Sequence, residues 1–124
     1  MPLTKDFRET VKARADRDPA FRAGLYQEAV QAMLDGDFAT GRLLLRDFIN
    51  ATIGFPTLAE RLGVHDKSLM RMFGAAGNPH AENLLAVLHA LKDECRLSLR
   101  VEAKPVRRRQ AVVRHTDGTP APYM

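Results

Sequence analysis

Apolar residues recur at helical spacing through most of the chain. Residues 4–15 place Phe7 and Val11 four positions apart, and residues 19–35 and 38–53 repeat apolar positions every three or four residues. Residues 80–93 carry a stripe of four leucines. Such spacing puts the apolar side chains on one face of each helix. The chain is therefore predicted to be all-α, a multi-helix bundle. The four leucines are Leu84, Leu85, Leu88 and Leu91.

Residues that start or stop helices separate these segments. Asp18 precedes Pro19, which predicts an N-cap followed by proline at the first helical position. Gly36 is expected to end that helix and Asp37 to cap the next. Gly54 is expected to end the helix over residues 38–53.

Residues 57–73 predict two short helices joined by a turn. Thr57 and Glu60 match a capping box, so the first helix is expected to begin at Thr57. Gly63 suits a turn that needs positive φ, and Val64 is expected to fill its corner. The inner side of the first helix is assigned to Leu58, Ala59 and Leu62.

The second of these helices is expected to begin near His65 or Asp66. Its inward face is predicted to consist of Leu69, Met72 and Phe73. The opposite side then carries Lys67, Met70, Arg71 and Gly74. Two short helices around a glycine turn are typical of a helix-turn-helix, and a cationic outer face on the second helix is what a major-groove reader needs.

The connection to the last predicted helix reads GAAGNP. Gly77 is expected to adopt positive φ, Asn78 to cap and Pro79 to open the helix over residues 80–93. Beyond this helix the period changes to two. This alternation predicts a short strand over residues 96–103, which must pair with something, plausibly the same strand of a second subunit. The alternating residues are Leu97, Leu99 and Val101 against Ser98, Arg100 and Glu102.

The predicted organisation has four parts. Residues 1–36 form N-terminal helices that pack on the core, and residues 37–95 form the helix-turn-helix core. Residues 96–103 form the strand, and residues 104–124 form an extended basic tail. Residues 96–124 hold seven Lys and Arg against two Asp and Glu, whereas the rest of the chain is close to neutral. A basic end suggests a polyanionic partner, and a solvated tail is the alternative.

Several classes of function find no support in the sequence. A single cysteine, Cys95, excludes an intrachain disulfide, and it is expected to be a buried or half-buried thiol at a helix end. The histidines show no metal-ligand spacing, and no activated nucleophile, pair of acids or phosphate loop is present at usable spacing. We therefore expect no enzyme, no metal and no cofactor. Without a signal peptide or a long apolar run, the protein is expected to be cytoplasmic and not to engage a membrane.

The stretches TLAERLGVHDKSLMRMF, GNP and ENLLAVLHAL together resemble the helix-turn-helix of the Xre/Cro/lambda-repressor family. Within that family the chain is most similar to the addiction-module antidote group, the HigA-like antitoxins, over roughly residues 15–103. His65 stands where that group usually has Ser, so the N-cap is weaker or moves to Asp66. The residues that match the group's pattern are Gly63, Val64, Ser68, Leu69, Arg71, Gly77, Asn78 and Pro79.

Two sets of DNA contacts follow as expectations. Base readers are Lys67, Met70, Arg71, Ser68 and Asp66. Met70 would touch a thymine methyl, or belong to the core. Asp66 would accept from a cytosine amine, or only cap its helix. Phosphate contacts are assigned to Thr57, His65, Asn78, Arg107, Arg108 and Arg109. Thr57 and Asn78 could be only caps and His65 only a turn residue. The three arginines could instead contact a protein or stay unbound.

The predicted function is a sequence-specific repressor that binds double-stranded operator DNA as a homodimer. The resemblance implies an antitoxin that binds a RelE/ParE-like toxin and represses its own operon. Two alternatives stay open. One is a stand-alone Xre-type regulator without a toxin, and the other is a protein-interaction module that no longer reads DNA.

Overall fold

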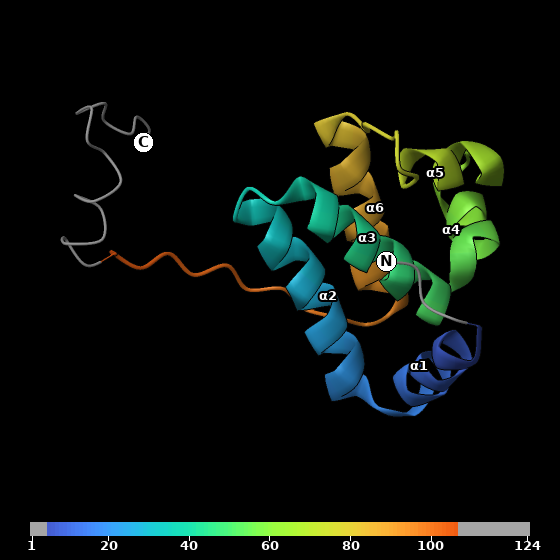
Figure 1. Ribbon diagram of the computed structural model, residues 1–124, viewed down its shortest axis with the longest axis horizontal. Helices are drawn as coiled ribbons and strands as arrows, with labels where there is room; N and C mark the ends of the chain where they lie inside the picture. The colour runs from blue at the N-terminus through green and yellow to red at the C-terminus, as the bar shows by residue number, and fades with distance from the viewer. Residues whose placement is uncertain (1–4, 107–124) are drawn as a thin grey trace.

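The computed structural model describes residues 5–106, with side chains described from residue 9 onward (Figure 1). This part of the chain contains helices and no strands, so the all-helical prediction is confirmed for it. None of its helices is long and apolar enough to cross a membrane. The helices are α1 (Lys5–Arg17), α2 (Pro19–Leu34), α3 (Phe38–Ala51), α4 (Gly54–Leu62), α5 (Asp66–Met72) and α6 (Ala81–Glu94).

Helices α2 and α3 begin where the sequence places their starts. Asp18 Oδ1 accepts a hydrogen bond from the Phe21 amide at 3.2 Å, and Pro19 opens α2. Asp37 Oδ1 accepts from the Thr40 amide at 3.2 Å and caps α3. The expected end of α3 at residue 53 is wrong, because the helix stops at Ala51.

The core gathers side chains from five helices. Tyr26 of α2 packs against Phe48 of α3, with ring centroids 5.5 Å apart. The Tyr26 hydroxyl donates to the Leu88 carbonyl at 2.8 Å and so ties α2 to α6. Burial raises the pKa of Tyr26 to about 12. The cluster of buried side chains is Tyr26, Ala29, Val30, Leu45, Phe48, Ile49, Phe55, Leu58, Ala59, Leu69, Phe73, Val87, Ala90, Leu91 and Cys95. The cluster joins side chains from the predicted N-terminal part, residues 1–36, with side chains from the predicted core part, residues 37–95.

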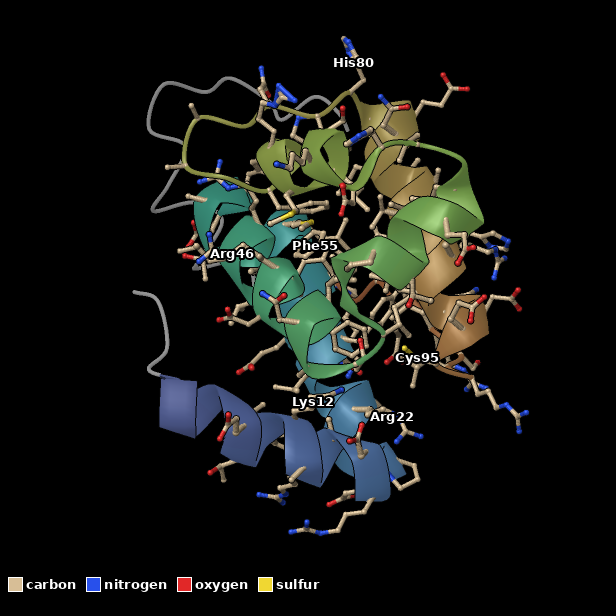
Figure 2. The ribbon with its side chains drawn as sticks, turned by 90° about the vertical axis from the view of Figure 1, so that its right-hand side faces the viewer. Lys12, Arg22, Arg46, Phe55, His80 and Cys95 are labelled. Carbon is tan, nitrogen blue, oxygen red and sulfur yellow. The ribbon has the colours of Figure 1, made fainter. Side chains whose placement is uncertain are left out.

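Helix α1 lies across one end of α2 and α3 (Figure 1). Lys12 Nζ donates to the Thr52 carbonyl at 3.2 Å, and Arg22 Nη1 donates to the Ala15 carbonyl at 2.6 Å. Figure 2 shows both labelled side chains between α1 and the rest of the bundle. Since Ala15 is fully buried, α1 is attached by packing as well as by these hydrogen bonds.

A pair of ion contacts joins α4 to the end of α6. Arg61 donates from Nη2 to Asp93 Oδ2 at 2.9 Å and from Nη1 to Glu94 Oε2 at 2.6 Å. The two carboxylates raise the pKa of Arg61, through its hydrogen bond to Glu94 first and to Asp93 second. These contacts are partly solvated, so they orient the two helices more than they stabilise the fold.

Helix α6 presents a different face to the core from the one predicted. Leu91 is fully buried and Val87 is 1% exposed, but Leu85 is 63% exposed. The assignment of Leu85 to the core was wrong, because it lies about 100° around the helix from Leu84 and about 200° from Val87. Cys95 follows the helix and is buried as expected, and burial raises the pKa of its thiol.

The strand predicted over residues 96–103 is not formed within the described chain. Residues 97–106 have no regular hydrogen-bonded structure. Leu97 and Leu99 pack partly against the core, whereas Val101 is 72% exposed. In Figure 1 the segment, drawn in orange, passes behind α2 and runs away from the helices. A strand formed between two copies of the chain stays a prediction.

Candidate nucleic-acid interface

Helix α4 begins three residues earlier than the capping-box pattern predicts. It starts at Gly54, and Ile53 in the N-cap position makes no side-chain hydrogen bond. Pro56 is tolerated in the first turn, where a backbone N–H would have no helical partner. Burial of Phe55, which is 5% exposed, favours this earlier start. Thr57 is therefore an exposed residue inside the helix, not its cap.

Gly63 makes the turn between α4 and α5, as predicted. Its φ is +71°, in the left-handed region that glycine adopts without strain. The amide of Val64 then donates to the Ala59 carbonyl at 3.0 Å. Val64 was expected to fill the corner of the turn, but its side chain is 47% exposed. Leu62 at the end of α4 packs against the core instead.

His65 caps helix α5. Its Nδ1 accepts from the Lys67 amide at 3.3 Å, so His65 occupies the N-cap position and Asp66 the first helical position. Of the two alternatives for this cap, the move to Asp66 is wrong and the cap stays at His65, because an imidazole nitrogen without a proton can accept the bond that a serine oxygen would accept. The same nitrogen lies 3.3 Å from Asp66 Oδ1. His65 and Asp66 therefore lie together at the N-terminus of α5.

The inner face of α5 anchors it to the bundle. Leu69 is 1% exposed and Phe73 is fully buried, while Met72 is half-buried against the same core. The Phe73 ring lies 6.1 Å from that of Phe55 on α4, measured between centroids. This inward face agrees with the prediction, and it gives the short helix a defined rotation about its axis.

The outer face of α5 carries the predicted base readers. Lys67 and Arg71 are exposed, and Met70 is 50% exposed, so Met70 is not a core residue. These three side chains line one shallow hollow. Arg71 also borders a second hollow, where Ser68 and Asn78 lie together with the loop of residues 74–79. The fold therefore brings four of the five predicted base readers and Asn78 to one continuous surface.

The loop between α5 and α6 differs from the prediction in three ways. Gly77 does not have positive φ. Asn78 is not a cap and Pro79 does not open the helix, because α6 begins at Ala81 with His80 in the N-cap position. Proline disfavours helical conformation in the residue before it, which keeps Asn78 outside the helix. His80 points outward at the tip of this loop (Figure 2).

Glycine is needed at position 77 for a different reason. A Cβ built there would overlap the carbonyl oxygen of Met72 and lie 2.6 Å from that of Arg71. The loop backbone therefore passes directly over the last turn of α5. A close approach between two backbone segments leaves no periodic signal in a sequence. From the sequence, positive φ was therefore the reason expected for a glycine at position 77.

Two arginines on α3 were not singled out from the sequence. Arg42 Nη1 donates to the Gly77 carbonyl at 3.2 Å, and its Nε is buried with no hydrogen-bond partner among the described residues. Arg46 lies one turn further along α3, half-buried, on the outer flank of the helix in Figure 2. Their i, i+4 spacing was a usable signal for a shared helix face, but it did not reveal which loop that face meets.

The charge of this surface is mixed. Lys67 and Arg71 are accompanied by Asp66 at the start of α5 and by Glu82 in the first turn of α6. Arg107, Arg108 and Arg109 lie outside the described residues, so their predicted phosphate contacts stay predictions. Among the residues whose side chains are described, no group of three or more His, Cys, Asp or Glu could hold a metal ion. Comparison of the chain with protein-family models, curated proteins and solved structures finds no match.

Proposed function

We propose that the chain is a sequence-specific DNA-binding regulator whose helix α5 enters the major groove. One observation carries this proposal. Lys67, Met70 and Arg71 project from the outer face of a short helix whose rotation is set by the buried Leu69 and Phe73. A helix that reads bases must present a few long side chains in a constant direction, and the glycine turn before α5 suits a helix-turn-helix.

Each exposed side chain has a matching partner on the edges of the bases. Arg71 and Lys67 can donate to the O6 and N7 atoms of guanine, and the Met70 side chain can contact a thymine methyl. Ser68 can pair with several bases. Arg71 borders both hollows, so it is the central reader in this arrangement.

Contacts to phosphates would come from the rim of the same surface. Asn78 is exposed and borders the hollow beside Arg71, and His65 is exposed at the start of α5. Thr57 is less suited than the sequence suggests, since it lies inside α4 and not at the N-terminus of that helix. Because the charge here is mixed, we expect the basic residues 107–109 to supply part of the non-specific attraction.

The regulatory context remains a hypothesis that rests on resemblance alone. A HigA-like antitoxin would hold a RelE/ParE-like toxin and repress its own operon. Affinity purification of the tagged chain from its native host, with and without nuclease, would test this. A stoichiometric small basic protein that survives nuclease supports the antitoxin role. Co-purifying DNA without such a protein supports a stand-alone repressor, and loss of both favours the interaction module.

The central test is selection of binding sequences from a random pool of double-stranded DNA. The full chain should enrich one short motif. In the double variant Lys67→Ala, Arg71→Ala the enrichment of that motif over random sequence should fall by at least about tenfold, because each base contact contributes roughly 1–3 kcal/mol of discrimination. Arg17→Ala, Lys104→Ala is the matched control, because it removes two exposed cations that lie outside α5. Both variants should keep the wild-type circular dichroism. A double variant at α5 that still enriches the wild-type motif would refute the proposed reading face.

A further inference from the structure

The segment after α6, residues 97–106, has backbone N–H and C=O groups that could pair with a second strand. Its last backbone hydrogen bond runs from the Leu97 amide to the Lys92 carbonyl at 2.8 Å. Within the described residues, no backbone hydrogen bond involves residues 98–106. Unpaired N–H and C=O groups along such a segment are a template for a second strand.

The side chains of this segment are sorted by face. Leu97 and Leu99 pack partly against the core, and Val101 continues the same alternation but is 72% exposed. Ser98, Arg100 and Glu102 alternate with them and are exposed. The segment therefore has one apolar side, attached to the bundle at its first half, and one polar side. Its second half leaves the body of the molecule (Figure 1), and the Val101 side chain is largely exposed.

We propose that two copies of the chain dimerise by antiparallel pairing of residues 99–103, with Val101 of each copy facing the other on the two-fold axis. In this register Arg100 of one copy lies directly opposite Glu102 of the other, and the symmetry makes this pair twice. Leu99 then faces Ala103. Opposite charges and apolar pairs directly across two strands stabilise a sheet.

The charges select this register over its neighbours. Centring the pair on Arg100 or on Glu102 would set two like charges opposite each other. A shift by one residue would place the apolar sides of the two copies on opposite faces. Because Leu97 and Leu99 already hold the first half of the segment on the core, the two strands would not have to order from a free chain.

A two-fold dimer would also present two α5 helices to DNA. This consequence rests on the proposed function, because only a groove reader needs a second half-site. The pairing itself does not depend on DNA, so the two proposals can fail separately.

The first experiment uses disulfide trapping. In a Cys95→Ala background, Val101→Cys should give a covalent dimer under mild oxidation, since residues that face each other across antiparallel strands lie within disulfide range. Ala103→Cys is the control. In the proposed register it faces Leu99, and its own symmetry mate lies about 13 Å away along the strand, too far to cross-link. Equal cross-linking at both positions would overturn the register.

The second experiment exchanges the charges in the full-length chain. Arg100→Glu and Glu102→Arg each set like charges opposite each other at two symmetric positions, so each should raise the dimer dissociation constant roughly tenfold. The double variant Arg100→Glu, Glu102→Arg restores both pairs and should return the constant toward the wild-type value. Sedimentation velocity over a range of concentrations, without DNA, measures these constants.

Three outcomes would overturn the proposed pairing. The first is a chain that stays monomeric up to high micromolar concentration, and the second is a double variant no better than the single variants. The third is protection of amides 98–103 from hydrogen exchange that does not depend on concentration, which would mean that the segment pairs within its own chain. A monomer that still selects a DNA motif would leave the proposed function standing. A dimer that selects none would refute only that function.

Discussion

Arg42 on α3 holds the loop that follows α5. Its Nη1 donates to the carbonyl oxygen of Gly77 at 3.2 Å, across 35 positions of the chain. Gly77 in turn lies so close to the last turn of α5 that there is no room for a Cβ atom at this position. This one hydrogen bond therefore connects the helix before the turn motif to the edge of the proposed reading surface.

Replacing Arg42 by alanine should weaken both the fold and DNA binding. The bond comes from a charged donor in a half-buried position, so its loss should lower the free energy of unfolding by about 1–2 kcal/mol. The released loop should also lower affinity for the selected DNA motif. Urea denaturation and fluorescence anisotropy measure the two effects. Arg46→Ala removes the same charge from the same helix without this bond. Equal unfolding midpoints for the two variants would show that the contact with Gly77 contributes nothing.

Gly77→Ala should shift the end of α5. Its Cβ would meet the carbonyl oxygens of Met72 and Arg71, which are backbone atoms and cannot rotate away. We expect a loss of roughly 1–3 kcal/mol in unfolding free energy and weaker binding of the motif. Gly74→Ala is the matched control. Its Cβ would lie 3.5 Å from the Arg71 carbonyl, an ordinary contact, so stability should change by less than about 0.5 kcal/mol. If the two substitutions cost the same, the loop does not pass over α5 as closely as described.

Tyr26 should make the fold sensitive to alkaline pH. Burial raises its pKa to about 12 in the folded chain, against about 10 when unfolded, so folding favours the neutral phenol. Its contribution is complete below pH 10 and is lost between pH 10 and 12, by at most about 1.4 kcal/mol for each pH unit.

The matched variant for this measurement is Tyr26→Phe. It should be about 1 kcal/mol less stable at neutral pH, because the hydrogen bond to the Leu88 carbonyl is lost. Its stability should also fall less steeply above pH 10. Denaturation curves at a series of pH values give both quantities. Parallel profiles for the two proteins would mean that Tyr26 does not resist ionisation in the folded state.

Sequence patterns predicted the structure correctly where a feature depends on residues only a few positions apart in the chain. Asp18 with Pro19, and Asp37 after Gly36, predicted helix starts that the structure has, since a cap is a bond between near neighbours. Gly63 predicted a left-handed turn for the same local reason. The exposed face of α5 also followed from spacing alone, because helical geometry fixes which residues share a side.

Other features were decided by packing. Thr57 and Glu60 match a capping box, yet α4 starts at Gly54, where burial of Phe55 outweighs a local cap. Leu85 has the same hydrophobicity as Leu91 but faces outward, because neighbouring helices determine which part of an apolar stripe becomes the interface. The alternating segment after Cys95 found no partner strand within the described chain, since strand pairing is a non-local property.

The sequence by itself determined the all-helical class, the capped starts of α2 and α3, the glycine turn and the set of side chains on the outer face of α5. These depend on bonds and rotations between residues close in the chain. Only the tertiary structure decided that Arg42 reaches Gly77, that the 74–79 loop borders Ser68 and Arg71, and that Arg61 joins α4 to α6. The contacts of Arg42 and Arg61 span tens of residues. All three features are set by how the helices and loops pack around the shared core, which no local period encodes.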